Sequence, residues 1–95
     1  MLVTAVETIF GLAADEFCGS GKEARSVMAK EVFILIGKDA GASLTQLSVI
    51  VGLDTSTVSR RYESAIQNSK KNSKMAYACH LVKSHYDASI AELQD

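Results

Sequence analysis

One short stretch of the chain, residues 55–61, gathers hydroxyl side chains and two adjacent arginines. Ser and Thr hydroxyls bond base edges or phosphates, the Thr methyl packs on a thymine methyl, and Arg forks onto guanine or holds a phosphate. Unpaired amides at the start of a helix also favour a phosphate oxygen nearby. We predict that Thr55, Ser56 and Arg60 contact bases. Phosphates are predicted to be held or flanked by Thr57, Ser59 and Arg61.

Two short helices joined by a glycine turn would position these side chains. Ser43 is a preferred N-cap residue, and Gln46 three residues later completes a capping box. Gly52 follows the last apolar residue of the first helix, where glycine suits the left-handed conformation that ends a helix. Asp54 is again an N-cap residue and begins the second helix. The pattern predicts a helix-turn-helix at about residues 43–67.

Apolar residues recur at three- and four-residue spacing in both helices, which gives each helix one buried face. The hydroxyl and arginine side chains are left on the outer face of the second helix, which such a unit lays into the major groove of DNA. Ser43 and Thr45 are predicted to hold phosphate at the first helix. The alternative is an ordinary helical hairpin with a polar, solvated face. The predicted buried residues are Leu44, Leu47, Ile50, Val51, Val58, Tyr62, Ala65 and Ile66.

The composition is that of a small all-α domain. The chain has 95 residues, of which 47% are hydrophobic and 22% charged, and it contains no proline, a residue that helix interiors exclude. We expect a compact helical domain over residues 1–72 and a long amphipathic C-terminal helix over residues 73–95. No apolar run approaches the length of a membrane span, and the start lacks a signal-peptide pattern. We therefore expect no membrane partner and a cytoplasmic location.

Positive charge gathers around the predicted binding unit, although the net charge of the whole chain is −1. Residues 20–75 hold nine basic side chains against five acidic ones, a net charge of +4. Residues 1–19 carry −3 and residues 76–95 carry −2. Phosphate contacts dominate affinity for DNA, so this distribution predicts a weakly basic face. Further weak phosphate attraction is expected from Lys70, Lys71 and Lys74.

Helices are also predicted before the binding unit. A short helix is expected near residues 3–10, a helical turn at 13–17, and a long helix at 22–36 followed by a loop at 37–42. In the long helix, Lys22, Arg25 and Lys30 are expected to stay in water. Its predicted apolar stripe is Ala24, Val27, Met28, Val32, Leu35 and Ile36.

A last helix is predicted over residues 73–93, after a polar stretch at 67–74 that is either a frayed helix end or a short link. Its apolar positions recur with a heptad-like spacing. Two interpretations stay open: the helix packs on its own domain, or it forms a homodimer contact. The repeating positions are Met75, Cys79, Val82, Tyr86, Ser89 and Leu93.

No group of residues predicts catalysis, a metal site or a cofactor site. Cys18 and Cys79 are too few for a metal cage, so we expect idle thiols, with a disulfide as the alternative. His80 and His85 lie five residues apart and do not share a helix face. We therefore expect neither an enzyme nor a small-molecule substrate.

The sequence S-L-x-x-L-x-x-x-x-G-x-D-x-S-T-V at residues 43–58, with Glu23-Ala24-Arg25 leading the long helix, resembles the C-terminal DNA-binding domain of the bacterial replication initiator DnaA. It is also similar to the related C-terminal domain of transposase-like proteins of the REP-associated tyrosine type. The resemblance covers about residues 3–68. It implies a Trp-repressor-like helical fold and a recognition helix that reads the major groove.

The resemblance also implies contacts at particular residues. The major-groove readers of the family match Asp54, Thr55, Ser56 and Thr57, and its minor-groove arginine matches Arg25, which Lys22 would assist. The initiator's signature has a histidine where this chain has Thr55, so the resemblance implies DNA binding without giving the site. We predict sequence-specific binding to double-stranded DNA, as the DNA-binding part of a transposase-like or initiator-like protein. The alternative is a protein-interaction module that keeps the fold.

Overall fold

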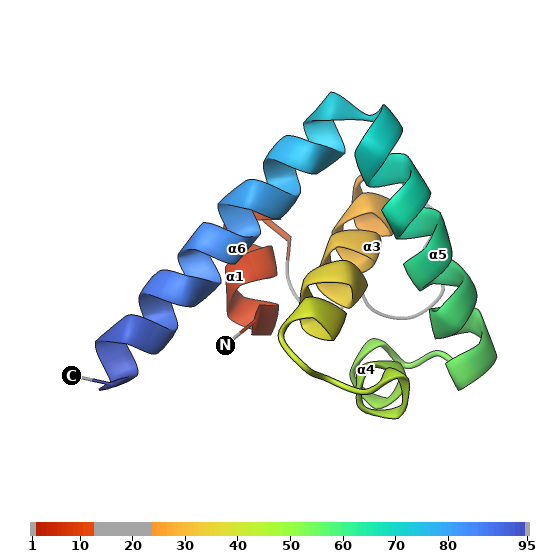
Figure 1. Cartoon of the computed structure of the whole chain (residues 1–95), viewed down its shortest axis with the longest axis horizontal. Coiled ribbons are helices and arrows are strands. Elements are labelled where there is room, and N and C mark those ends of the chain that lie inside the picture. Colours follow the sequence, from red (N-terminus) through yellow and green to blue (C-terminus); the bar gives the residue numbers. More distant parts are fainter. Residues whose placement is uncertain (1, 13–23, 95) are drawn as a thin grey trace.

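The chain folds as an all-α protein, as the sequence predicts (Figure 1). A computed structural model describes residues 2–12 and 24–94, and for residues 89–94 it describes the backbone alone. None of the described residues forms a strand. The described helices are α1 (Leu2–Phe10), α3 (Ala24–Asp39), α4 (Leu44–Val51), α5 (Thr55–Lys71) and α6 (Ser73–Gln94).

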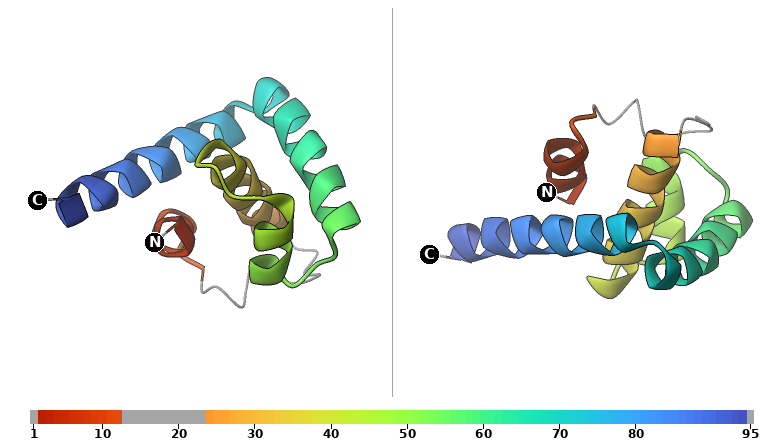
Figure 2. Two further views of the ribbon diagram at one scale, coloured as in Figure 1. Left: turned by 60° about the horizontal axis from the view of Figure 1, so that its bottom comes forward. Right: turned by 90° about the horizontal axis from the view of Figure 1, so that it is seen from above.

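Helix α3 is the central element, and all the other described helices pack against it. In Figures 1 and 2, α5 and α6 form a V with α3 between its arms. A helix surrounded in this way is buried on more than one side, so the single stripe predicted from its sequence covers only part of the buried surface. Val32 and Ile36 of that stripe are buried and Met28 and Leu35 pack against the core, whereas Ala24 is exposed. The other large buried residues of α3 are Phe33 and Ile34.

Lys30 is a second correction on α3, because the sequence pattern predicts that this side chain stays in water. The structure leaves Lys30 only 1% exposed. Its charge therefore contributes little to the basic surface expected from the charge count. Arg25, in contrast, lies on the first turn of α3 and is exposed as predicted.

The long helix continues three residues beyond the predicted end at Ile36 and takes Gly37, the predicted start of a loop, into its last turn. Gly37 is buried against α4, and a Cβ atom placed there would lie 2.6 Å from Cδ2 of Leu47. The absence of a side chain at this position lets the two helices approach closely. The chain then turns at Gly41, within the loop that the sequence predicts at 37–42, and the φ of this glycine is +100°.

The corner between α5 and α6 is a single residue, Asn72. Its side-chain Oδ1 accepts hydrogen bonds from the amides of Lys74, at 3.0 Å, and Met75, at 3.3 Å. These bonds satisfy two amides that the start of α6 leaves open. The polar stretch at 67–74, predicted as a frayed end or a link, is therefore helical on both sides of this residue.

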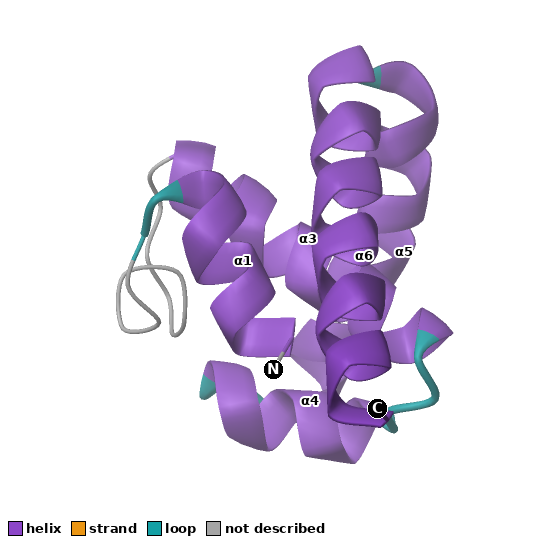
Figure 3. Cartoon of the chain, turned by 90° about the vertical axis from the view of Figure 1, so that its left-hand side faces the viewer, coloured by secondary structure: helices purple, strands orange, loops and turns teal. Residues whose placement is uncertain are grey.

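Helix α6 lies across α1 and α3, as Figure 3 shows. Met75 and Val82 of the predicted seam are buried in the core of the domain, and Cys79 and Tyr86 pack against that core. The described part of the seam therefore packs on the chain's own domain, which is the first of the two interpretations. Ser89 and Leu93 lie outside the residues with described side chains. A homodimer through this helix stays a prediction.

Within the described residues, no helix is both long and apolar enough to cross a membrane. Cys79 is a free, half-buried thiol, and Cys18 lies outside the described residues. Burial, and after it the nearby Asp39 carboxylate, raises the pKa of the Cys79 thiol. A raised pKa lowers the thiolate fraction at neutral pH, as expected for an idle thiol.

Candidate nucleic-acid interface

The helix start predicted at Ser43 is confirmed in detail. Ser43 caps α4, and its Oγ accepts a hydrogen bond from the amide of Gln46 at 3.1 Å. The Gln46 side chain accepts one from the amide of Ser43 at 2.9 Å, which completes the capping box. The Ser43 hydroxyl accepts this bond through its oxygen, so its hydrogen can still be donated to a phosphate.

Residues 52–54 connect α4 to α5. Gly52 adopts the left-handed conformation, with φ +75°, and its amide donates to the carbonyl of Ser48 at 2.9 Å. Asp54 then caps α5, and its carboxylate accepts from the amide of Thr57 at 3.0 Å. The turn is therefore short and bonded at both ends, which fixes the direction in which α5 leaves α4.

The inner face of α5 is fixed by apolar contacts. Val58 and Ala65 are fully buried, together with Leu47 and Val51 of α4. Ile50 is a correction: the sequence pattern places it on the buried face of α4, whereas the structure leaves 48% of it exposed. Ile50 lies at the edge of the buried stripe, next to the exposed Val49.

The outer face of α5 carries the predicted base-contacting side chains. Thr55, Ser56 and Arg60 are exposed, and Thr57 and Ser59 are half-exposed. Arg60 lies 3.5 Å from Thr57, measured from Nη2 to Oγ1. These side chains stand on the first two turns of a helix whose opposite face is held in the core, so they reach outward together. A hollow of about 360 Å³ beside them is lined by Thr57, Arg60, Arg61 and Ser64.

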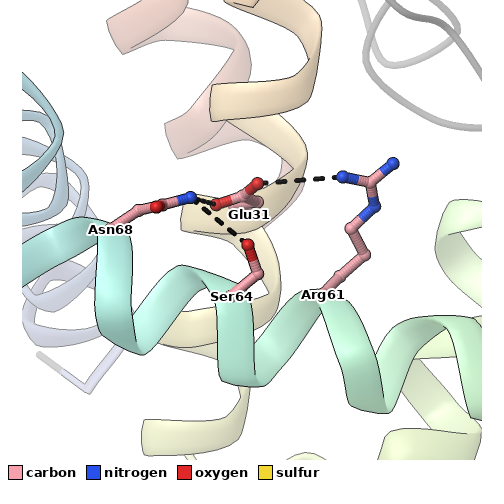
Figure 4. A network of polar contacts seen from close by, with 4 residues as sticks. All are labelled: Glu31, Arg61, Ser64 and Asn68. Carbon is pink, nitrogen blue, oxygen red and sulfur yellow. Dashed lines mark hydrogen bonds and ion pairs between the residues drawn. The ribbon is translucent and has the colours of Figure 1, made fainter.

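Arg61 has a partner that the sequence does not predict. Its Nη1 lies 3.9 Å from Oε1 of Glu31 on α3, and the Arg61 side chain is 40% exposed (Figure 4). The sequence alone suggests a pair with Glu63 or packing on Tyr62, and neither interpretation includes Glu31. Residues 31–37 are apolar except for Glu31. An acidic residue in such a run is the sequence signal that could have pointed to Glu31 as a partner.

Thr45 lies on an uncharged part of the surface. Thr45 is exposed on α4, but it lines a hollow of about 540 Å³ together with Ala42, Gln46, Val49 and Ile50. These neighbours are uncharged, so the surface around Thr45 lacks the cations that a phosphate site usually has. Among the described residues, no basic side chain lines this hollow, and the phosphate contact of Thr45 stays a prediction.

Arg25 and Lys22 are the predicted second point of contact. Nη2 of Arg25 donates a hydrogen bond to the carbonyl of Phe10, one of the carbonyls left open at the end of α1. This bond ties the start of α3 to the end of α1. Lys22 lies outside the described residues. A contact of Arg25 with DNA stays a prediction.

Four further cations lie at two places beside α5. Lys38, at the end of α3, holds its Nζ 5.9 Å from the ring centre of Tyr62, a cation–π distance. Lys70, Lys71 and Lys74 are exposed near the corner with α6. In the described part of the chain, no group of three or more His, Cys, Asp or Glu side chains could hold a metal ion.

Asp54 makes the start of α5 sensitive to pH. The Thr57 side chain, and after it the Thr57 amide, hold the pKa of Asp54 below its ordinary value of 3.8. A folded-state pKa below the unfolded one means that the cap stabilises the fold above pH 3.8 and loses this effect as the pH falls through the lower value. Asp54→Ala should therefore lower the melting temperature at neutral pH and change it less in strong acid.

The measurement is thermal unfolding followed by helical circular dichroism at neutral and strongly acidic pH. Ser43→Ala is the matched control, because it removes the cap of α4 without removing a titrating group. Its effect on melting should be similar at both pH values. An Asp54→Ala deficit that persists unchanged in acid would contradict this account of the cap.

No protein-family model, no curated protein and no solved structure matches the chain. The resemblance to the DnaA C-terminal domain, drawn from the sequence, therefore stays a prediction. A function for α4 and α5 accordingly rests on their own geometry: two helices, a short hydrogen-bonded turn between them, and a polar outer face on the second helix.

Proposed function

We propose that the chain binds double-stranded DNA at a specific sequence and that α4 and α5 act as a helix-turn-helix. The observation that carries the proposal is the outward cluster of Thr55, Ser56 and Arg60 on the first turns of α5, opposite a face held in the core by Val58 and Ala65. A helix of about 10–12 Å diameter fits the major groove, which is about 12 Å wide.

The side chains supply two kinds of contact. Thr55, Ser56 and Arg60 bond base edges, and the forked guanidinium of Arg60 suits the paired acceptors of guanine. Thr57 and Ser59, at the sides of the helix, flank the phosphates. Lys70 and its neighbours add sequence-independent attraction. We further propose that this is the DNA-binding part of a transposase-like or initiator-like protein, acting in the cytoplasm.

Selection from a random duplex library tests the proposal. The purified chain should enrich a defined sequence, and its affinity for that duplex should fall as salt rises, because each neutralised phosphate releases counterions. The affinity can be followed by fluorescence anisotropy of the labelled duplex. If the chain showed no salt-dependent binding to any duplex at low ionic strength, the proposal would be wrong.

A second candidate function, protein interaction through α4, is favoured by one observation. Val49 is 78% exposed and the adjacent Ile50 is 48% exposed, and with Ala42 they border the uncharged hollow of about 540 Å³. No charged residue occurs in residues 40–53. Exposed apolar patches of this kind mark contact surfaces. The partner that fits is another uncharged apolar surface, such as the same patch on a second copy.

Val49→Glu should abolish self-association if two copies pair through this patch, because a carboxylate would be desolvated in the contact. Sedimentation velocity over a range of protein concentrations measures the association. Tyr77→Ser on α6, where the tyrosine is 64% exposed, is the control and should leave it unchanged. A wild-type chain that stays monomeric at high concentration would exclude this pairing.

A further inference from the structure

Glu31 is a buried acidic residue that faces the helix carrying the proposed DNA contacts. Its side chain is only 5% exposed. A carboxylate buried in this way is costly unless it is paired and hydrogen-bonded. Figure 4 shows that the partners drawn around it, Arg61, Ser64 and Asn68, all come from α5. They recur at three- and four-residue spacing and so share one face of that helix.

The two contacts of Glu31 differ in length. Nδ2 of Asn68 donates to Oε2 of Glu31 at 2.9 Å, an ordinary hydrogen-bond length, and the same Nδ2 lies 3.3 Å from Oγ of Ser64. Arg61 lies farther away, with 3.9 Å between Nη1 and Oε1. A hydrogen-bonded arginine–carboxylate pair has a distance of about 2.7–2.9 Å. Asn68 is therefore held firmly by Glu31, whereas Arg61 is held only by charge.

Arg61 also reaches the outer surface. Its side chain is 40% exposed, and it lines the hollow of about 360 Å³ beside Thr57 and Arg60. A guanidinium has five N–H donors, so the contact with Glu31 leaves most of them available. One arginine thus stands between a carboxylate in the core and a basic surface on α5.

We propose that Glu31 is a positioning residue that restrains Arg61, so that a DNA phosphate must compete with the Glu31 carboxylate for the guanidinium. This inference rests on the proposed DNA binding. In the free protein, Glu31 offsets the charge of one of the two adjacent arginines, and Arg60 keeps its full attraction. The pair lowers the sequence-independent part of binding, which comes from phosphate contacts, and leaves base readout to Arg60.

Glu31→Gln tests this role, because glutamine has nearly the same size and keeps an oxygen that can accept from Asn68. The variant should bind every duplex several-fold more tightly at low salt. The slope of log affinity against log salt should steepen by about 0.9, the value for one more neutralised phosphate. A purely structural role of Glu31 would not steepen this slope. Glu31→Asp, which keeps the charge, should stay close to wild type.

Arg61→Gln is the matched variant and completes a double-mutant cycle. In the wild-type background it should change the salt slope little, because Arg61 is restrained. In the Glu31→Gln background it should remove the whole gain in affinity and slope. Equal effects of Arg61→Gln in the two backgrounds would overturn the inference, since they would mean that Glu31 does not control this arginine.

A measurement on the wild-type chain covers the case in which Glu31→Gln fails to fold. The ¹⁵N–¹H signal of the Arg61 Nε group should shift much less than that of Arg60 when a short duplex is added, because Glu31 keeps the Arg61 guanidinium from the phosphates. An Arg61 signal that shifts as much as the Arg60 signal would overturn the inference. If the wild-type chain binds DNA and a folded Glu31→Gln variant gains no affinity, the inference about Glu31 would be overturned and the proposed function would stand. No duplex binding by either protein would overturn the proposed function as well.

Discussion

Replacing Leu47 by alanine should lower the free energy of unfolding by about 2–5 kcal/mol, the range for removing a buried leucine side chain. Leu47 is 1% exposed and carries the contact between α4 and α3 at Gly37. Small domains have a total stability of about 5–15 kcal/mol, so this single change removes a large part of it. Chemical denaturation followed by circular dichroism measures the loss. DNA affinity should fall with it, because α4 sets the direction of α5.

Val49→Ala is the control for this change, since it truncates an apolar residue of the same helix that is 78% exposed. Its effect should stay within about 0.5 kcal/mol, as for most surface substitutions. A loss of the same size as in Leu47→Ala would contradict the burial of Leu47.

The same contact makes a second test available. In a helix, alanine is normally more favourable than glycine by about 1 kcal/mol. Gly37→Ala should nevertheless destabilise the wild-type chain, because its methyl group would lie 2.6 Å from Cδ2 of Leu47. In the Leu47→Ala background, Gly37→Ala should instead stabilise. Additive effects of the two changes would show that the residues are not in contact.

Arg60→Ala should cost about 1–3 kcal/mol of binding free energy at one base position and relax the preference there. Arg60 is exposed on the outer face of α5, and its described contact is the 3.5 Å approach to Thr57. It is therefore available for a bidentate bond to guanine, which is the most common specific contact of arginine. Binding to duplexes that differ at single positions, measured at fixed salt, locates the position.

Lys70→Ala is the control for this loss of specificity. Lys70 is exposed near the end of α5, away from the proposed base contacts. Its removal should weaken binding to all sequences about equally and reduce the salt slope by about 0.9 or less. If Arg60→Ala also weakened all sequences equally, Arg60 would be a phosphate contact and the proposed reading of bases would be wrong.

Local chemistry makes the α4–α5 unit predictable from the sequence. Caps depend on a few neighbouring residues, so Ser43, Gly52 and Asp54 can be assigned, and the structure confirms each of them. The buried faces of short helices follow from spacing as well, although Ile50, at the margin of its stripe, is misplaced by the pattern.

Contacts between distant parts of the chain cannot be predicted in this way. An amphipathic pattern assumes that only one face of a helix is buried, whereas α3 packs against all the other described helices, so the pattern wrongly places Lys30 in water. The pattern also assigns Gly37 to a loop, although the packing of α4 holds this residue in α3. Glu31 and Arg61 are brought together by the packing of α3 on α5, and no local rule links them. The sequence indicates which side chains suit DNA, but not which of them the fold restrains.

The close contact at Gly37 has a consequence for protein engineering. A cassette of α4 and α5 moved into another helical scaffold would carry its caps and its turn with it, because these are local. It would not carry Gly37 of α3, against which the Leu47 side chain packs. In a host helix with a larger residue at the equivalent of Gly37, the Leu47 side chain or α4 itself would have to shift to make room. The transferable unit therefore includes one glycine that lies outside the segment to be moved.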